Sequence, residues 1–223
     1  MRGGITILFI AGIASFVIAS IIYGIWRERK RRQQLRQVAD DLGLEYVAKG
    51  EHPLYSVVHD FRLFSHGRSR KRSKLIAGET DDLTIGVFDY AYTTNSGENS
   101  TTHRQSVVAL HSDAIVIPCF NLRPQNMLDR LGAAMGLQDI DFENHPNFSQ
   151  MFVLQGEDEA AIRTFFDGDW LDFLENYRGF SIEGRNGSLI FYKARHRIRP
   201  NEIKNYLGKA YEIYGHIIER STG

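Results

Sequence analysis

Three acidic residues form a group whose spacing could suit acid–base catalysis. Asp139, Asp141 and Glu143 alternate with Ile140 and Phe142. Two neighbouring carboxylates can act as general acid and general base, as hydrolases require. An acidic loop beside a strand would show the same residues without any catalysis. A hydrolase using Asp139 and Asp141 is therefore the alternative to a protein without enzymatic activity.

Other catalytic and ligand-binding signatures are absent from the sequence. It contains no HExxH, CxxC, GxSxG, GxxxxGK[ST] or GxGxxG pattern, and its eight histidines are scattered. Cys119 lies in the apolar run AIVIPCF, which is typical of an inert buried thiol in a strand. Asp167-Gly168-Asp169 lacks the downstream ligands of a calcium loop, so Asp167 is predicted to cap a helix. The sequence predicts no metal site and no cofactor.

A second cluster is basic and lies in the stretch FSHGRSRKRSKLIAG. Its members are Arg68, Arg70, Lys71, Arg72 and Lys74. The cluster separates FRLFS from KLIAG, two stretches with the composition of strands, so it is predicted to be a hairpin loop.

The charge distribution limits what this cluster could bind. Residues 1–74 carry 14 Lys and Arg against 6 Asp and Glu, and residues 75–223 carry 13 against 21. The rest of the chain, residues 75–223, is acidic, and the basic residues of the cluster do not alternate with aromatic residues. Both features argue against nucleic acid as the ligand. Anionic lipid headgroups fit better, at about 1 kcal/mol for each cation near the surface. An acidic protein partner, the chain's own acidic half and a solvated loop remain open.

The N-terminal segment is predicted to cross a membrane. Residues 5–26 carry no charge, and a helix of that length spans roughly 33 Å, close to a hydrocarbon core of ~30 Å. A cleaved signal peptide is the competing interpretation, but its apolar core would usually be ~7–15 residues long. A basic stop-transfer block also follows this segment. Residues 1–26 are therefore assigned to a tail and a transmembrane helix.

The flanking charges predict the topology. Arg2 is the one basic residue before the apolar segment, and the residues that follow it are Arg27, Arg29, Lys30, Arg31 and Arg32. Because Lys and Arg near a membrane end stay on the cytoplasmic side, we expect the N-terminus outside and the C-terminus in the cytoplasm. A single cysteine fits that reducing compartment.

Helix is predicted to continue through a basic juxtamembrane segment, residues 27–43. Leu35, Val38 and Leu42 recur at helical spacing, and Gly43 suits a helix end. Residues 44–223 are predicted to be a soluble α+β domain with a β-rich first half and a mixed second half, in one unit or in two lobes, 44–122 and 123–223.

The predicted strands of the domain are LEYVA, FRLFS, KLIAG, LTIGVFDYAYTT, QSVVAL, AIVIPCF and QMFVLQG, with a hairpin of FSIEG and SLIFYKA around Asn186-Gly187. The predicted helices are QNMLDRLGAAMG, EDEAAIRTFF, DWLDFLENYRG and a last helix that starts at Pro200. Phe88, Tyr90 and Tyr92 alternate with other residues, which places the three rings on one face of their strand.

Several stretches, among them LGLEY, LFSHGRSRKRSKLIAG, VFDYAYTT and LRPQNMLDRLGAAMG, resemble a group of uncharacterised bacterial single-pass membrane proteins of unknown function. The resemblance implies a location in the bacterial cytoplasmic (inner) membrane. It implies no catalytic residue, since none is established for that group.

The sequence thus favours a membrane-anchored cytoplasmic interaction or accessory domain. Its predicted partners are the membrane itself, anionic headgroups, and a protein or a second copy of the chain. Ala11, Ser15 and Ala19 share one helical face, and small residues at this spacing allow two membrane helices to approach closely.

Overall fold

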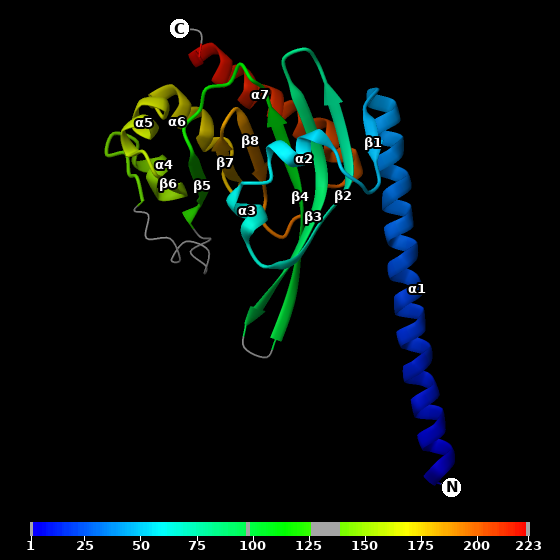
Figure 1. Cartoon of the computed structure of the whole chain (residues 1–223). Helices are drawn as coiled ribbons and strands as arrows, with labels where there is room; N and C mark the ends of the chain where they lie inside the picture. The colour runs from blue at the N-terminus through cyan, green and yellow to red at the C-terminus, as the bar shows by residue number, and fades with distance from the viewer. Residues whose placement is uncertain (1, 97–98, 126–138, 222–223) are drawn as a thin grey trace.

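A single helix, α1 (Arg2–Leu42), contains both the apolar segment and the juxtamembrane segment (Figure 1). The computed structural model describes residues 2–96, 99–125 and 139–221. Helix α1 is long and apolar enough to cross a membrane, and its residues from 10 to 27 are exposed. It ends as predicted at Gly43, which has a φ of 68°, and the Leu44 N–H donates to the Ala39 carbonyl at 2.8 Å. The predicted continuous helix is confirmed.

One antiparallel sheet of eight strands, ordered β1-β2-β3-β4-β8-β7-β5-β6, forms the centre of the domain. The strands are β1 (Glu45–Val47), β2 (Arg68–Glu79), β3 (Thr84–Ser96), β4 (Asn99–His111), β5 (Phe120–Pro124), β6 (Phe152–Gly156), β7 (Ser181–Arg185) and β8 (Ser188–Tyr192). Pairing of β4 with β8 joins the strands of the first half to those of the second. Together with the helices this confirms the α+β class.

Helices cover both faces of this sheet. The short helices α2 (Pro53–Val57) and α3 (Arg62–Ser65) cross one face (Figure 1). The other core is formed with the C-terminal end of α1 and with α4 (Pro146–Met151), α5 (Glu159–Phe165), α6 (Gly168–Glu175) and α7 (Ile203–Ser221), which follows a 3-10 turn (Pro200–Glu202). Asp167 caps α6 as predicted, since its carboxylate accepts from the Trp170 N–H at 3.1 Å.

The two cores follow the alternation of β3. Phe88, Tyr90 and Tyr92 belong to the smaller core with α2 and α3, which confirms their predicted common face. Val87 belongs to the larger core, together with Leu35 of α1. Asp89 shares the face of Val87, so the juxtamembrane part of α1 covers a charged residue of the sheet.

Three predictions of local structure were wrong. FRLFS forms α3 rather than a strand, and the strand predicted at KLIAG begins earlier, at Arg68, so the basic cluster is not a hairpin loop. AIVIPCF is almost entirely outside the sheet: β5 begins at Phe120, after a proline that cannot donate to a ladder. Cys119 is accordingly half-buried. Nearly all of the predicted helix QNMLDRLGAAMG lies outside the described residues.

Candidate functional site

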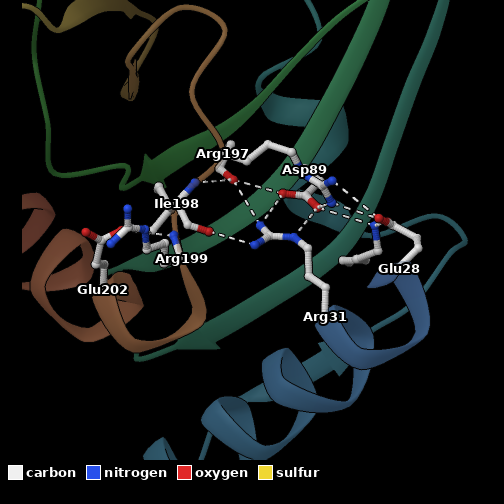
Figure 2. Close-up of polar contacts among 9 residues, drawn as sticks. Glu28, Arg31, Asp89, Arg197, Ile198, Arg199 and Glu202 are labelled. Carbon is white, nitrogen blue, oxygen red and sulfur yellow. Dashed lines mark hydrogen bonds and ion pairs between the residues drawn. The ribbon is translucent and has the colours of Figure 1, made fainter. Parts of the chain in front are cut away.

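A partly buried group of charges joins α1 to the sheet at Asp89 (Figure 2). Arg31 of α1 donates to both carboxylate oxygens of Asp89, from Nε at 3.1 Å and from Nη2 at 2.8 Å. Its remaining Nη1 donates to the Ile198 carbonyl at 2.8 Å. Ser106 on the neighbouring strand β4 adds a hydroxyl donor at 2.8 Å. This forked geometry is the strong form of an ion pair because two parallel hydrogen bonds fix the guanidinium.

Two further cations and a second carboxylate complete the group. Arg197 pairs with Asp89 at 2.6 Å and with Glu28 of α1 at 3.2 Å. Lys74 of β2 contacts the same two carboxylates. Lys74 is turned inward at a bulge in β2, where its φ is 56° and the pairing with β3 shifts register between Ser73 and Ile76. Glu28, Arg31, Lys74, Asp89 and Arg197 are called the anchor cluster below.

The anchor cluster keeps its carboxylates ionised. Burial alone would raise the pKa of Asp89, but the hydrogen bonds and charge of Arg31, with those of Arg197, outweigh it and hold the pKa well below its ordinary value. Glu28 follows the same balance, since Lys74 and Arg197 lower its pKa against burial. Carboxylates held this way do not accept a proton near neutral pH. The cluster therefore fixes α1 against the domain and is unsuited to acid–base catalysis.

The predicted basic surface separates into two groups. Arg70 and Arg72 donate to the Phe64 and Tyr55 carbonyls, at 2.6 and 2.9 Å, and Lys74 belongs to the anchor cluster. Arg68 and Lys71 are exposed, and within the described part of the chain their side chains make no hydrogen bond or ion pair. Two residues of the predicted basic surface, Arg70 and Arg72, thus hold β2 against α2 and α3.

The predicted acidic pair is divided between two tasks. Asp139 accepts the Leu154 N–H at 2.9 Å and so fixes the chain beside β6. Burial raises the pKa of Asp139, with a smaller contribution from Asp141. Asp141 lines a small cavity with His145 and Arg163, and Asp139 is not among that cavity's described lining residues. The two carboxylates therefore do not converge on one cavity in the described structure.

A larger cavity, of about 1200 Å3, lies where the sheet opens beside the β3–β4 hairpin. Strand β4 pairs with β8 over residues 107–111, and beyond Tyr192 the chain leaves the sheet. The Ser106 N–H donates to the His196 carbonyl at 2.9 Å, which ties the departing chain back to β4. The cavity is enclosed by residues 101–104 of β4, residues 192–196, and parts of α3, β5 and β7.

Cations dominate the lining of this cavity. The lining residues with charged side chains are Arg62, Arg104, Arg123, Lys193, Arg195 and Glu183. Burial, and then the neighbouring Arg62 guanidinium, lower the pKa of Arg123, with Asp139 acting in the opposite direction. The side chain of Arg195 makes no ion pair among the residues that the structure describes. The described lining thus carries five cations and one carboxylate, which gives the cavity a positive potential.

Aromatic rings form one wall of this cavity. The Tyr92 ring contacts the rings of His66 and His103, with centroids 5.4 and 4.9 Å apart. Burial lowers the pKa of both histidines, and Arg62 adds to the effect at His66 while Arg195 does so at His103. Both rings are therefore neutral near pH 7, and each has one ring nitrogen that donates a hydrogen bond and one that accepts.

The one acidic residue in the described lining of this cavity, Glu183, is fully buried. Glu183 accepts the Tyr192 hydroxyl at 3.0 Å and the Leu63 N–H at 3.2 Å. Burial raises the pKa of Glu183 to about 7, and these hydrogen bonds and Arg62 oppose the rise. Its charge is therefore partly neutralised at neutral pH, which leaves the cations of the cavity further unbalanced.

Sequence reasoning missed both Asp89 and the cavity. Asp89 could have been noticed in the sequence, because it is a single acidic residue between Phe88 and Tyr90 in a long predicted strand. An acidic residue on the second face of such a strand is either exposed to solvent or paired with a cation. The cavity had no such signal, since its residues come from six separate stretches of the chain.

No known family model matches the chain, and no curated protein matches it either. Among solved structures, the fold is similar to the crystal structure of the mycobacterial trehalose monomycolate transport factor A, TtfA. The TM-score is 0.53 with 12% sequence identity, over 75% of this chain and 83% of that chain. This similarity is one of fold.

Proposed function

We propose that this protein is an accessory factor of the bacterial inner membrane, anchored by α1 with its domain in the cytoplasm. The observation that carries the proposal is the anchor cluster. A tether that only localised a domain would need no buried ion pairs to the sheet, whereas here Arg31 and Glu28 fix the domain's position relative to the helix. Such fixation serves a domain that must present one surface at a defined place beside the membrane.

The flanking charges support the orientation. Arg27, Arg29, Lys30 and Arg32 are exposed next to the apolar segment, and the Lys30 ammonium lies 5.2 Å from the centre of the Trp26 ring. Cations at one end of an apolar helix indicate its cytoplasmic end, and an aromatic ring fits the headgroup layer at either end. The bacterial transport factor of similar fold supports an accessory role, and we extend the idea of assisting a membrane process to this chain.

The exposed cations of β2 support contact with anionic headgroups. Arg68 pairs in register with Thr93 on the part of β3 that approaches the hairpin tip, and Lys71 pairs with Ala91. This hairpin points to the same side of the domain as the N-terminal end of α1 (Figure 1). Arg68 and Lys71 therefore take the lipid-contact role proposed for the five-residue cluster, while Arg70, Arg72 and Lys74 support them through their internal contacts.

The hairpin is long enough to reach the membrane surface. From Asp89, opposite Arg31, β3 continues to Ser96, roughly 23 Å at ~3.3 Å per residue. From Arg31 to Trp26, α1 rises only about 7.5 Å. Residues 93–102 contain Thr, Asn and Ser with one Gly and one Glu, a composition excluded from hydrocarbon. For this polar stretch to stay out of the hydrocarbon, β3 must be inclined to the axis of α1, and the two elements diverge in Figure 1.

Topology and co-purification together test this proposal. A phosphatase active only in the periplasm, fused after Gly223, should stay inactive, while a cytoplasmic reporter fused there should be active. Affinity purification of the full chain from solubilised membranes should recover membrane proteins in constant ratio to it. An active phosphatase fusion would overturn the cytoplasmic assignment. Purification of the chain alone under mild detergent, at native expression, would count against the accessory role.

A further inference from the structure

We propose that the cavity beside the β3–β4 hairpin binds a phosphate-bearing anion with hydroxyl groups, supplied as the headgroup of an anionic phospholipid. The lipid source rests on the proposed orientation at the membrane, whereas the anion chemistry rests on the cavity alone. The cavity lies apart from the anchor cluster, whose residues are absent from its described lining.

The charges of the cavity favour an anion. A protein usually balances cations that share a cavity, as the anchor cluster does with Asp89 and Glu28. Here Arg62 and Arg123 line the cavity together, and burial and then the Arg62 guanidinium lower the pKa of Arg123. Arg195 contributes an exposed guanidinium, and the only described lining carboxylate, Glu183, is already hydrogen-bonded to Tyr192 and Leu63. A phosphate entering this space would relieve the repulsion and accept forked hydrogen bonds from guanidinium groups.

The uncharged lining favours a ligand with hydroxyl groups beside its phosphate. Thr94, Thr101, Thr102, Asn95 and Asn121 line the cavity. The Thr94 hydroxyl already contacts His103 Nε2 at 2.8 Å, which fixes the orientation of that ring. Hydroxyl and amide side chains donate and accept hydrogen bonds equally well, as a glycerol or sugar headgroup requires. The Tyr92 ring supplies an apolar surface for the carbon face of such a group.

The position of the cavity favours a lipid over a soluble ligand. One of its walls is the same hairpin that points to the side of the N-terminal end of α1 (Figure 1). With the hairpin tip in the headgroup layer, Thr94 and Thr101 lie between that layer and the buried Glu183. A headgroup could enter along the hairpin while its acyl chains stay in the bilayer.

The experiment uses the full chain in a neutral detergent and three probes: inorganic phosphate, glycerol phosphate and dihexanoyl phosphatidylglycerol. Binding is followed by calorimetry, and by the NMR titration of His66 and His103. We expect dihexanoyl phosphatidylglycerol to bind most tightly and to raise the pKa of both histidines, because an anion stabilises their charged forms. Dihexanoyl phosphatidylcholine, whose headgroup carries no net charge, should bind at least about tenfold more weakly.

Variants locate the binding. Arg195→Gln and, separately, Arg123→Gln should each weaken phosphatidylglycerol binding about tenfold or more. Lys204→Gln removes an exposed cation of α7 outside the cavity and should leave binding unchanged. Arg195 is exposed, so its variant should fold, and circular dichroism verifies this.

Each outcome decides one part of the proposal. Equal affinity for glycerol phosphate and the short-chain lipid would keep the anion site and overturn the lipid source. No binding of any probe, or binding that Arg195→Gln and Arg123→Gln leave unchanged, would overturn the site. These measurements need no membrane orientation, so a failed topology test would leave them valid, and their failure would leave the anchored domain intact.

Discussion

The anchor cluster and the cavity beside the hairpin both gather guanidinium groups, but they balance them differently. In the anchor cluster every cation has a carboxylate partner, and Asp89 accepts hydrogen bonds from two arginines, a lysine and a serine. In the cavity the described cations outnumber the single carboxylate, which is itself partly neutralised. Charge that is paired holds two elements together, whereas an excess of cations around an open volume attracts an anion. The following predictions test whether that distinction is real.

The largest expected effect is the loss of Asp89. Asp89→Ala leaves Arg31, Lys74 and Arg197 close together without their shared partner, and breaking a buried ion pair typically costs about 3–5 kcal/mol. The free energy of unfolding of the full chain in detergent should fall by that order in denaturant titrations. Asp82→Ala, at an exposed position, is the matched control and should change it by less than about 0.5 kcal/mol. Equal effects of the two variants would mean that the cluster does not hold the helix.

A fall in pH should weaken the same contact. Because the pKa of Asp89 is lower in the folded chain than its unfolded value of about 3.9, its stabilisation is complete above that value. The stabilisation is lost as the pH falls through the lower, folded value. Unfolding midpoints measured below about pH 4 should therefore drop steeply in the parent. They should drop less in Asp89→Asn, and parallel curves would contradict the assignment.

Glu183 should give the opposite pH dependence in the cavity. Its folded pKa of about 7 lies above the unfolded value of about 4.3, so the folded chain binds the extra proton between them. Stability should therefore decrease as the pH rises from about 4 to 8, by an amount of the order of 4 kcal/mol. Glu183→Gln keeps the shape of the side chain and should remove this slope. A slope that survives the substitution would have to come from another group.

The smallest expected effect concerns the exposed cations of β2. In nanodiscs that contain phosphatidylglycerol, amide hydrogen exchange at the start of β2 should be slower than in phosphatidylcholine nanodiscs. Arg68→Gln with Lys71→Gln should remove the difference, which corresponds to at most about 1 kcal/mol for each cation. Lys204→Gln serves again as the exposed control. Identical exchange in both lipids would leave Arg68 and Lys71 as solvated residues.

The parts of the fold that the sequence predicts are those with a local cause. The apolar segment, the helix end at Gly43, the cap at Asp167 and the face shared by Phe88, Tyr90 and Tyr92 each follow from periodicity or from one residue's conformational preference. FRLFS was misjudged because one helical turn of alternating residues resembles a short strand. In the structure, Phe61 and Phe64 at this helix pack against the sheet, within the smaller core.

The candidate sites were beyond such reasoning because their causes are distant in the chain. Lys74 was assigned to a loop, yet a bulge in β2 turns it inward toward Glu28, 46 residues earlier. Arg70 and Arg72 suggested a solvated surface, but backbone carbonyls of the preceding helices accept their hydrogen bonds. Arg31 was assigned a role in topology alone, and its partner Asp89 could be recognised only once α1 was known to cover that face of the sheet.

Because α1 is continuous from its apolar segment to the sheet, any rotation of that segment about the helix axis also rotates the domain. One residue inserted between Trp26 and Arg27 would turn the whole domain by about 100° around the helix axis and lift it about 1.5 Å. A partner embedded in the bilayer would then meet a different side of the sheet. Four inserted residues would return the domain to within about 40° of its original orientation. The rotation of α1 about its own axis thus decides which surface of the domain faces a neighbouring protein in the membrane.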